Sequence, residues 1–201
     1  MGKKLRWILV VLSVAVCVYF VGIVMDKQEL QDKVIRLHVV GASDSDRDQM
    51  LKLQVRDAVL ERLETALAGV TNKEQALGMI RGMADELSLT ADQVLAKAGT
   101  EDRVTVSVGE VSFPRRDYDT FSLPAGVYDA LKITIGEGQG RNWWCVVFPA
   151  LCRPAATGQV DAVAAGAGFS RGNRGALTGE YEVRFYLLDL WGRMENFFRS
   201  K

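Results

Sequence analysis

The stretch LPAGVYDALKITIGEGQGRNWWCVVFPALC, residues 123–152, decides the fold expected of this chain. Between residues 127 and 135 the side chains alternate, and one face carries Val127, Leu131, Ile133 and Ile135. This period of two predicts a half-buried strand. Residues 143–148 are apolar on both faces, which predicts a second strand that is central in its sheet or covered on its second face. The glycine-rich loop between them predicts a reversal that joins the two strands as a hairpin.

The chain before this stretch combines strand and helix patterns. Residues 34–40 and 103–111 alternate in the manner of strands. Between them, a capping pattern at Ser45 predicts the start of a long helix, and a second helix follows Asn72. A further capping pattern at Thr90 predicts the start of a shorter third helix.

These elements predict an α/β (α+β) fold. Residues 27–152 form a two-layer domain in which a four-stranded sheet is covered by helices mainly on one face. Residues 153–179 are rich in Ala and Gly without a period, and they predict a flexible linker. Residues 180–201 carry apolar side chains at helical spacing, which predicts a C-terminal amphipathic helix.

Residues 1–26 predict a membrane anchor or a signal peptide. The uncharged apolar run at 7–25 is long enough to span a ~30 Å hydrocarbon core as a helix, and three basic residues precede it. Because such basic residues stay in the cytoplasm, the rest of the chain is expected outside it. A cleaved signal peptide is the alternative, although no good cleavage site precedes Asp26. A buried helix of a soluble protein is the third interpretation.

Cys145 and Cys152 are the two cysteines of the part expected to be exported. Outside the cytoplasm, two cysteines at this spacing favour a disulfide over a metal site. A turn over residues 148–151 would bring their Cα atoms within the separation of about 4.4–6.8 Å that such bonds need. Free thiols are the alternative, and redox catalysis would favour a tighter Cys-x-x-Cys spacing.

His38 could take part in one catalytic arrangement. His38, the only histidine, together with Ser43 or Cys145 would suit a hydrolase, provided that nucleophile, base and orienting acid are in contact. The structural interpretation places His38 on the polar face of a strand and Ser43 in the turn before a helix. We favour the structural interpretation and expect no catalytic residue.

Spacing and charge argue against other kinds of site. The acidic run at 44–48 imitates a calcium loop, but Gln49 stands where a glycine is required and Val55 where a bidentate acid is required. The loop at 136–140 leads into a strand, whereas phosphate loops lead into a helix. With 25 basic and 25 acidic residues, the chain has no basic footprint for nucleic acid. We therefore expect no cofactor, metal ion, nucleic acid or small-molecule substrate.

A partner-binding surface is the remaining interpretation. Trp143 and Trp144 point to opposite faces of their strand, so either both are core residues or one belongs to a contact surface that includes the C-terminal helix. The candidate partner-binding residues are Asn142, Trp143, Trp144, Phe148, Tyr128, Trp191 and His38.

Three groups of motifs carry a family resemblance. They are IRLHVVGASDS with LQVRDAV at 35–45 and 53–59, then LPAG, IGEGQGRNWWCV and FPALC at 123–126, 135–146 and 148–152, and finally YEVRF at 181–185. In these motifs the chain resembles the stage II sporulation protein R family, and the Asn-Trp-Trp-Cys block is the most specific of them. The expected linker gains no support from the resemblance.

The resemblance implies an intercellular signal of endospore formation. Members are made in the forespore and stay at its membrane or enter the space between forespore and mother cell. The implied partner is a membrane-embedded protease of the mother cell that processes the sigma-E precursor, and the family's protein is its ligand and not the enzyme. Residues 7–25 would provide the membrane contact. A cell-envelope hydrolase using His38 and a structural envelope protein are the alternative functions.

Overall fold

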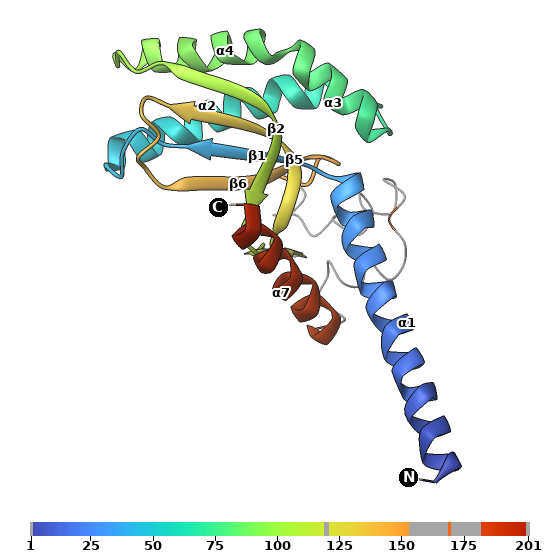
Figure 1. The fold of residues 1–201 in the computed structure, drawn as a ribbon. Helices are drawn as coiled ribbons and strands as arrows, with labels where there is room; N and C mark the ends of the chain where they lie inside the picture. Colours follow the sequence, from blue (N-terminus) through green and yellow to red (C-terminus); the bar gives the residue numbers. More distant parts are fainter. Residues whose placement is uncertain (1, 119–120, 153–168, 170–181, 200–201) are drawn as a thin grey trace.

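The structure is a computed structural model that describes residues 2–118, 121–152, 169 and 182–199. Its elements in chain order are α1 (Lys3–Lys33), β1 (Ile35–Val40), α2 (Asp46–Ala66), α3 (Lys73–Gly82), α4 (Ala84–Lys97), β2 (Val104–Phe113), β3 (Arg116–Asp117), β4 (Ser122–Leu123), β5 (Gly126–Ile135), β6 (Asn142–Phe148) and α7 (Glu182–Arg199). The expected mixed fold and its four-stranded sheet are confirmed (Figure 1).

The strand order corrects the expected hairpin. The sheet has the order β2-β5-β1-β6, so β1 lies between the two strands that were expected to pair. It runs parallel to β5 and antiparallel to β6. Every residue of β1 is buried, as befits a strand with neighbours on both sides. The strand β6 is consequently an edge strand, and its two apolar faces reflect packing on both sides of the sheet.

The loop at 136–141 crosses the end of β1 and is held there by hydrogen bonds from its backbone amides. Gly140 N donates to Gly41 O at 2.9 Å, and Arg141 N donates to Asp44 Oδ1 at 2.7 Å. A Cβ on Gly140 would lie 2.3 Å from Ser43 O, so only glycine permits this approach. The loop therefore passes over the end of β1, and Gly140 allows it to pack closely against the residues that follow that strand.

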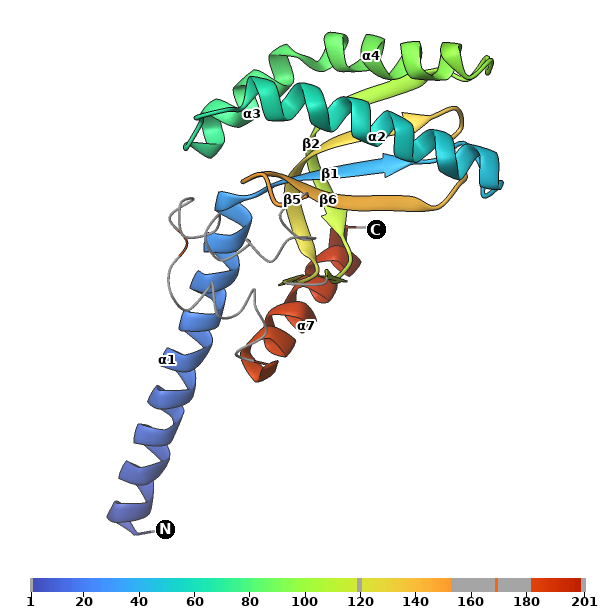
Figure 2. The same ribbon diagram turned by 180° about the vertical axis from the view of Figure 1, so that it is seen from behind.

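The first face of the sheet is covered by α2, α3 and α4 (Figure 2). The odd residues of β1 lie in this core, as the alternation predicts: Ile35, Leu37 and Val39. Their partners are aliphatic residues of the helices and of the neighbouring strands. This side of the molecule is an ordinary apolar core.

The second face is covered as well, which refines the expectation that helices lie mainly on one side. A second core joins the end of α1 to the sheet through Leu30, Val34, Tyr128 and Val146. The helix α7 packs on β5 and contacts α1, and both helices lie on the side of the sheet away from α2–α4 (Figures 1 and 2). The molecule thus has a helix layer on one face and two separate helices on the other.

Helix starts follow the sequence at two of three expected places. The Ser45 hydroxyl accepts a hydrogen bond from Asp48 N and begins α2, and the Asn72 side chain caps α3 in the same way. The expected start at Thr90 is wrong, because the helix break falls at Met83. The Thr90 hydroxyl instead donates to Glu86 O inside α4. A hydroxyl that bonds back to the preceding turn is compatible with a helix interior.

The helix α1 continues without a spacer into the domain. Gln31 Nε2 donates to Val127 O at 2.8 Å, and Lys73 Nζ donates to Gln31 O at 2.7 Å and pairs with Asp129. No helix in the described part of the chain is long and apolar enough to cross a membrane. The span expected over residues 7–25 therefore finds no support among the described residues.

The expected linker at 153–179 lies outside the described residues, apart from Phe169. That side chain is buried in the second core, where Lys33 Nζ lies 5.5 Å from the centre of its ring. The expected C-terminal helix is confirmed as α7.

Candidate partner-binding surface

The strand β6 carries its two tryptophans on opposite faces, as the sequence predicts. Trp143 packs against the first core, and the Arg56 guanidinium lies 4.2 Å from the centre of its ring. Trp144 packs against the second core. Both side chains are half-buried. Neither tryptophan is therefore a freely exposed anchor.

The second face brings three of the predicted residues together. His38 lies opposite Trp144 in the β1–β6 pairing, and their rings stack with centroids 3.8 Å apart. His38 Nε2 donates to Asn142 Oδ1 at 2.6 Å. Phe113 closes the group edge-on, 4.7 Å from Trp144. These four residues form one cluster, which we call the His38–Trp144 cluster.

The burial of His38 decides its charge. Desolvation lowers the pKa of His38 below 6.5, the positive charges of Lys132 and Arg36 lower it further, and the Asn142 hydrogen bond opposes them. The ring is therefore neutral near pH 7. Its Nδ1 atom is buried and has no hydrogen-bond partner in residues 2–118, 121–152, 169 and 182–199.

The residues of the hydrolase alternative do not meet. Ser43 Oγ donates to Asp48 Oδ2, so that hydroxyl serves the turn before α2. Cys145 lies in the first core, on the opposite side of the sheet from His38. Among the described residues, His38 has no nucleophile in contact. This geometry supports the structural interpretation of all three residues.

Arg36 is a central residue of this face that the sequence did not reveal. Its side chain is fully buried, with the guanidinium carbon 4.0 Å from the centre of the Phe113 ring and 5.0 Å from that of Tyr128. Nη2 donates to Tyr118 Oη at 3.0 Å, while Nε and Nη1 have no hydrogen-bond partner among the described residues. Alternation places Arg36 opposite the first core, but nothing local distinguishes a buried arginine from an exposed one.

Two other predicted residues are buried in the cores. The Tyr128 hydroxyl donates to Pro124 O at 2.8 Å, and burial raises the pKa of this phenol well above its usual value. Phe148 is a member of the first core. In this structure both side chains contribute to packing, and neither faces a partner.

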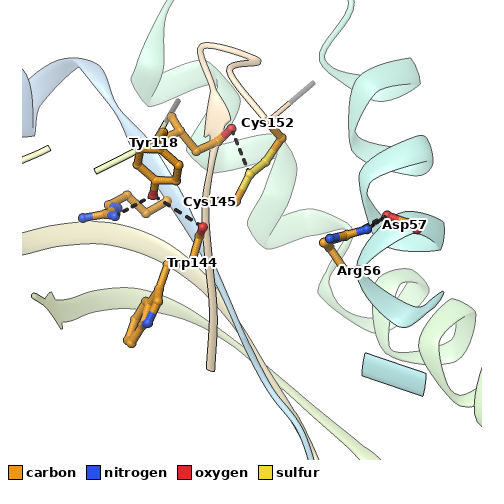
Figure 3. Close-up of a disulfide and its surroundings, with 8 residues drawn as sticks. Arg56, Asp57, Tyr118, Trp144, Cys145 and Cys152 are labelled. Carbon is orange, nitrogen blue, oxygen red and sulfur yellow. Dashed lines mark hydrogen bonds and ion pairs between the residues drawn. A yellow bond between two sulfur atoms is a disulfide. The ribbon is translucent and has the colours of Figure 1, made fainter. Parts of the chain in front are cut away.

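The predicted disulfide between Cys145 and Cys152 is present, with Cα atoms 5.7 Å apart. It ties β6 to the chain that returns after residues 149–150. Figure 3 shows the bond beside β6, with Tyr118 on one side of that strand and Arg56 on the other. The Tyr118 hydroxyl accepts a hydrogen bond from Arg36 Nη2 and donates to Trp144 O at 3.4 Å. The bond therefore fixes the strand that carries both tryptophans.

The helix α7 docks through its polar and small residues. The Asp189 carboxylate is buried, accepts a hydrogen bond from Ala125 N at 3.1 Å and pairs with Arg193. Gly192 packs so closely that a Cβ would lie 1.6 Å from Ala125 O. Asn196 Nδ2 donates to Phe113 O at 2.9 Å. Residues 189, 192 and 196 are spaced to share one side of a helix, and this side faces the sheet.

The apolar side of α7 is exposed. Trp191 is 51% exposed, which makes it the most accessible of the three tryptophans predicted for partner binding. Further large apolar side chains share this exposure, and we call the set the α7 stripe: Tyr186, Leu190, Trp191, Met194, Phe197 and Phe198. The stripe and the His38–Trp144 cluster both lie on the second side of the sheet.

No group of three His, Cys, Asp or Glu residues that could hold a metal ion occurs among the described residues. The geometry thus offers aromatic contact surfaces. The residues of the hydrolase alternative, His38, Ser43 and Cys145, have structural partners.

Comparison with known proteins identifies the family. A family model described as Stage II sporulation protein R matches residues 31–157. The chain is 41% identical over 123 residues to the Stage II sporulation protein R of Bacillus subtilis (strain 168). The aligned part is 61% of this chain and 55% of that relative, so the chain spans about half the length of the curated relative that it matches. No solved structure matches the chain.

The α7 helix and the expected closing motif at 181–185 lie outside the residues matched by the family model. Over the domain that contains both cores of the sheet, the chain belongs to the stage II sporulation protein R family.

Proposed function

We propose that this protein is an exported signal of endospore formation that activates a membrane-embedded protease of the mother cell. The protease then processes the sigma-E precursor. Membership of the sporulation family supports this proposal. The protein acts by contact and not as an enzyme, and it does so at the forespore membrane or in the space between the two cells.

The observation that carries the proposal is the exposed α7 stripe. Large apolar side chains dominate the energy of many interfaces, and tryptophan is among the most frequent anchors. Trp191 is held on a helix whose other side is fixed to the sheet by Asp189 and Asn196. An exposed aromatic on a rigid support is suited to contact, because little further ordering is needed on binding.

The N-terminal helix serves export and tethering in this proposal. From Leu5 to Met25 those large apolar side chains that the structure describes are 45–69% exposed, whereas Leu30 and Val34 belong to the second core. Replacing residues 1–26 with an unrelated cleavable signal peptide should keep these core residues and preserve signalling. An exported and stable substitute that is silent would show a specific role for the natural segment.

The direct test is co-expression of this chain with the protease and the sigma-E precursor, with precursor cleavage as the readout. Wild-type chain should produce cleavage, and Trp191→Ala should abolish it while the thermal midpoint stays nearly unchanged. Loss of one anchor weakens binding by about 30- to 1000-fold. Cleavage that does not depend on the chain would reject the proposal.

Leu89→Ala is the matched control, because Leu89 is 60% exposed but lies on α4, on the other side of the sheet. It should retain full activity. His38→Ala and Ser43→Ala test the hydrolase alternative. If these two variants fold yet lose activity while Trp191→Ala retains it, the function resides in a chemical site and not in a contact surface.

A further inference from the structure

The helix α7 has the reverse of the usual amphipathic arrangement. A helix on the surface of a soluble domain normally turns its apolar stripe to the core and its charged side to water. Among the α7 side chains that the structure describes, at residues 186 and 189–198, the buried positions are Asp189 and Gly192, and the half-buried Asn196 also faces the sheet. The residues of the α7 stripe are 46–71% exposed. The apolar side of α7 therefore faces away from the sheet.

The α7 stripe is not an isolated patch. The helix contacts α1, and both run away from the sheet on the same side (Figures 1 and 2). Between Leu5 and Met25, the described large apolar side chains of α1 are exposed. Two adjacent helices thus expose apolar side chains over much of their lengths. Exposed apolar surface of this extent is uncommon on soluble monomers and indicates a site of contact.

We propose that the α7 stripe rests on the surface of a lipid bilayer, beside α1. The acyl chains of a bilayer can cover the exposed sides of two diverging helices at once. The stripe combines Trp, Tyr and Phe with Leu and Met, as helices that lie at the membrane–water interface do. This inference deepens the proposed function. The stripe holds the chain at a membrane face, where a membrane-embedded protease is met, and Trp191→Ala abolishes signalling through the loss of that placement. The inference rests on the proposed function in assuming that the chain is exported to a membrane face.

The charges of α7 specify the kind of lipid. Acidic and basic residues are equal in number along the helix: Glu182, Asp189, Glu195, Arg184, Arg193 and Arg199. Asp189 and Arg193 also neutralise each other directly. Apolar burial, and not attraction to anionic headgroups, therefore drives the contact. Neutral phosphatidylcholine should suffice, and added salt should not release the helix.

Tryptophan quenching by phosphatidylcholine vesicles with brominated acyl chains tests this contact in the full-length chain. Trp7→Phe provides the background, because Trp7 is exposed on α1 and would itself report on the bilayer. In this background the vesicles should quench emission and shift its maximum to the blue. Adding Trp191→Phe should remove both effects, since Trp143 and Trp144 are half-buried in the sheet.

Leu89→Trp in the chain that lacks Trp7 and Trp191 is the matched control. It places an exposed tryptophan on α4, and the vesicles should not quench it. Equal quenching with and without Trp191, or quenching at Leu89→Trp as strong as at Trp191, would overturn the bilayer contact. If Trp191 is unquenched while Trp191→Ala still abolishes precursor cleavage, the stripe binds a protein, and the proposed function survives without the lipid contact.

Discussion

The two faces of the sheet are built from neighbouring residues of one strand, yet they pack by different physics. On the first face, Leu37 and Val39 are fully buried among aliphatic side chains. On the second, Arg36 and His38 are buried among aromatic rings. Within the part of the chain that the structure describes, Arg36 Nε and Nη1 and His38 Nδ1 lack hydrogen-bond partners.

The first face holds the domain together, whereas the second positions other parts of the molecule. Aliphatic packing gains free energy with the area removed from water and needs no exact orientation. Buried polar groups cost free energy unless they are paired, but they require definite partners. Tyr118, Asn142 and the docked α7 supply such partners on the second face. We expect the first face to dominate stability and the second to dominate signalling.

The largest expected effect comes from neighbouring substitutions on the two faces. Leu37→Ala should cost about 3–5 kcal/mol of unfolding free energy, because it leaves a cavity in a close-packed core. Arg36→Met removes a buried charge but keeps most of the volume, so it should cost less than about 1.5 kcal/mol or be stabilising. Urea unfolding measures both values. If Arg36→Met cost as much unfolding free energy as Leu37→Ala, the two faces would not differ in their contribution to stability. Arg36→Ala is the control for lost side-chain volume.

The disulfide should contribute less than the core. The chain between Cys145 and Cys152 closes a short ring, for which loop entropy predicts about 2.5 kcal/mol. Cys152→Ser should therefore lower the unfolding free energy by that order. Reductant should destabilise the wild-type chain by a similar amount and leave the variant unchanged. Two free thiols found by non-reducing peptide mapping of exported protein would contradict the pairing.

The docking of α7 can be disturbed by one methyl group. Gly192→Ala places a Cβ against Ala125 O and should displace the helix, at a cost of about 1–3 kcal/mol. Gly78→Ala is the matched control, since nothing lies within 4 Å of a Cβ at that helical glycine. That variant should gain about 0.5–1 kcal/mol. Faster amide hydrogen exchange confined to α7 would report undocking in Gly192→Ala, and unchanged exchange there would reject the tight contact.

The smallest expected effect is a pH dependence from the second face. Burial lowers the folded-state pKa of His38 below 6.5, so the unfolded chain takes up a proton first as the pH falls. The His38 contribution should therefore be neutral to stability above about pH 6.5 and should destabilise the fold progressively below it. His38→Gln should flatten this part of the stability profile. Identical profiles for the variant and the wild-type chain from pH 7.5 to 5 would show that His38 titrates normally.

Local patterns predicted most of the elements because their causes are local. The alternation in β5 and the capping side chains at Ser45 and Asn72 act within a few residues, so a sequence displays them directly. The cysteine pair was also recognisable, because only a short turn separates its members. The break between α3 and α4 was misplaced, since the capping pattern at Thr90 has an equally good use inside a helix.

Local sequence patterns were enough to locate the four strands of the sheet and most of the helices, to favour the disulfide and to recognise the family motifs. Only the tertiary structure decided that β1 inserts between β5 and β6, because the alternation of a strand is the same whichever neighbour pairs with it. It also decided the orientation of α7. An amphipathic pattern defines two sides of a helix, but the fit of Gly192 and Asp189 against Ala125 determines which side faces the sheet. The exposure of Trp191 follows from that fit and not from its own position in the sequence.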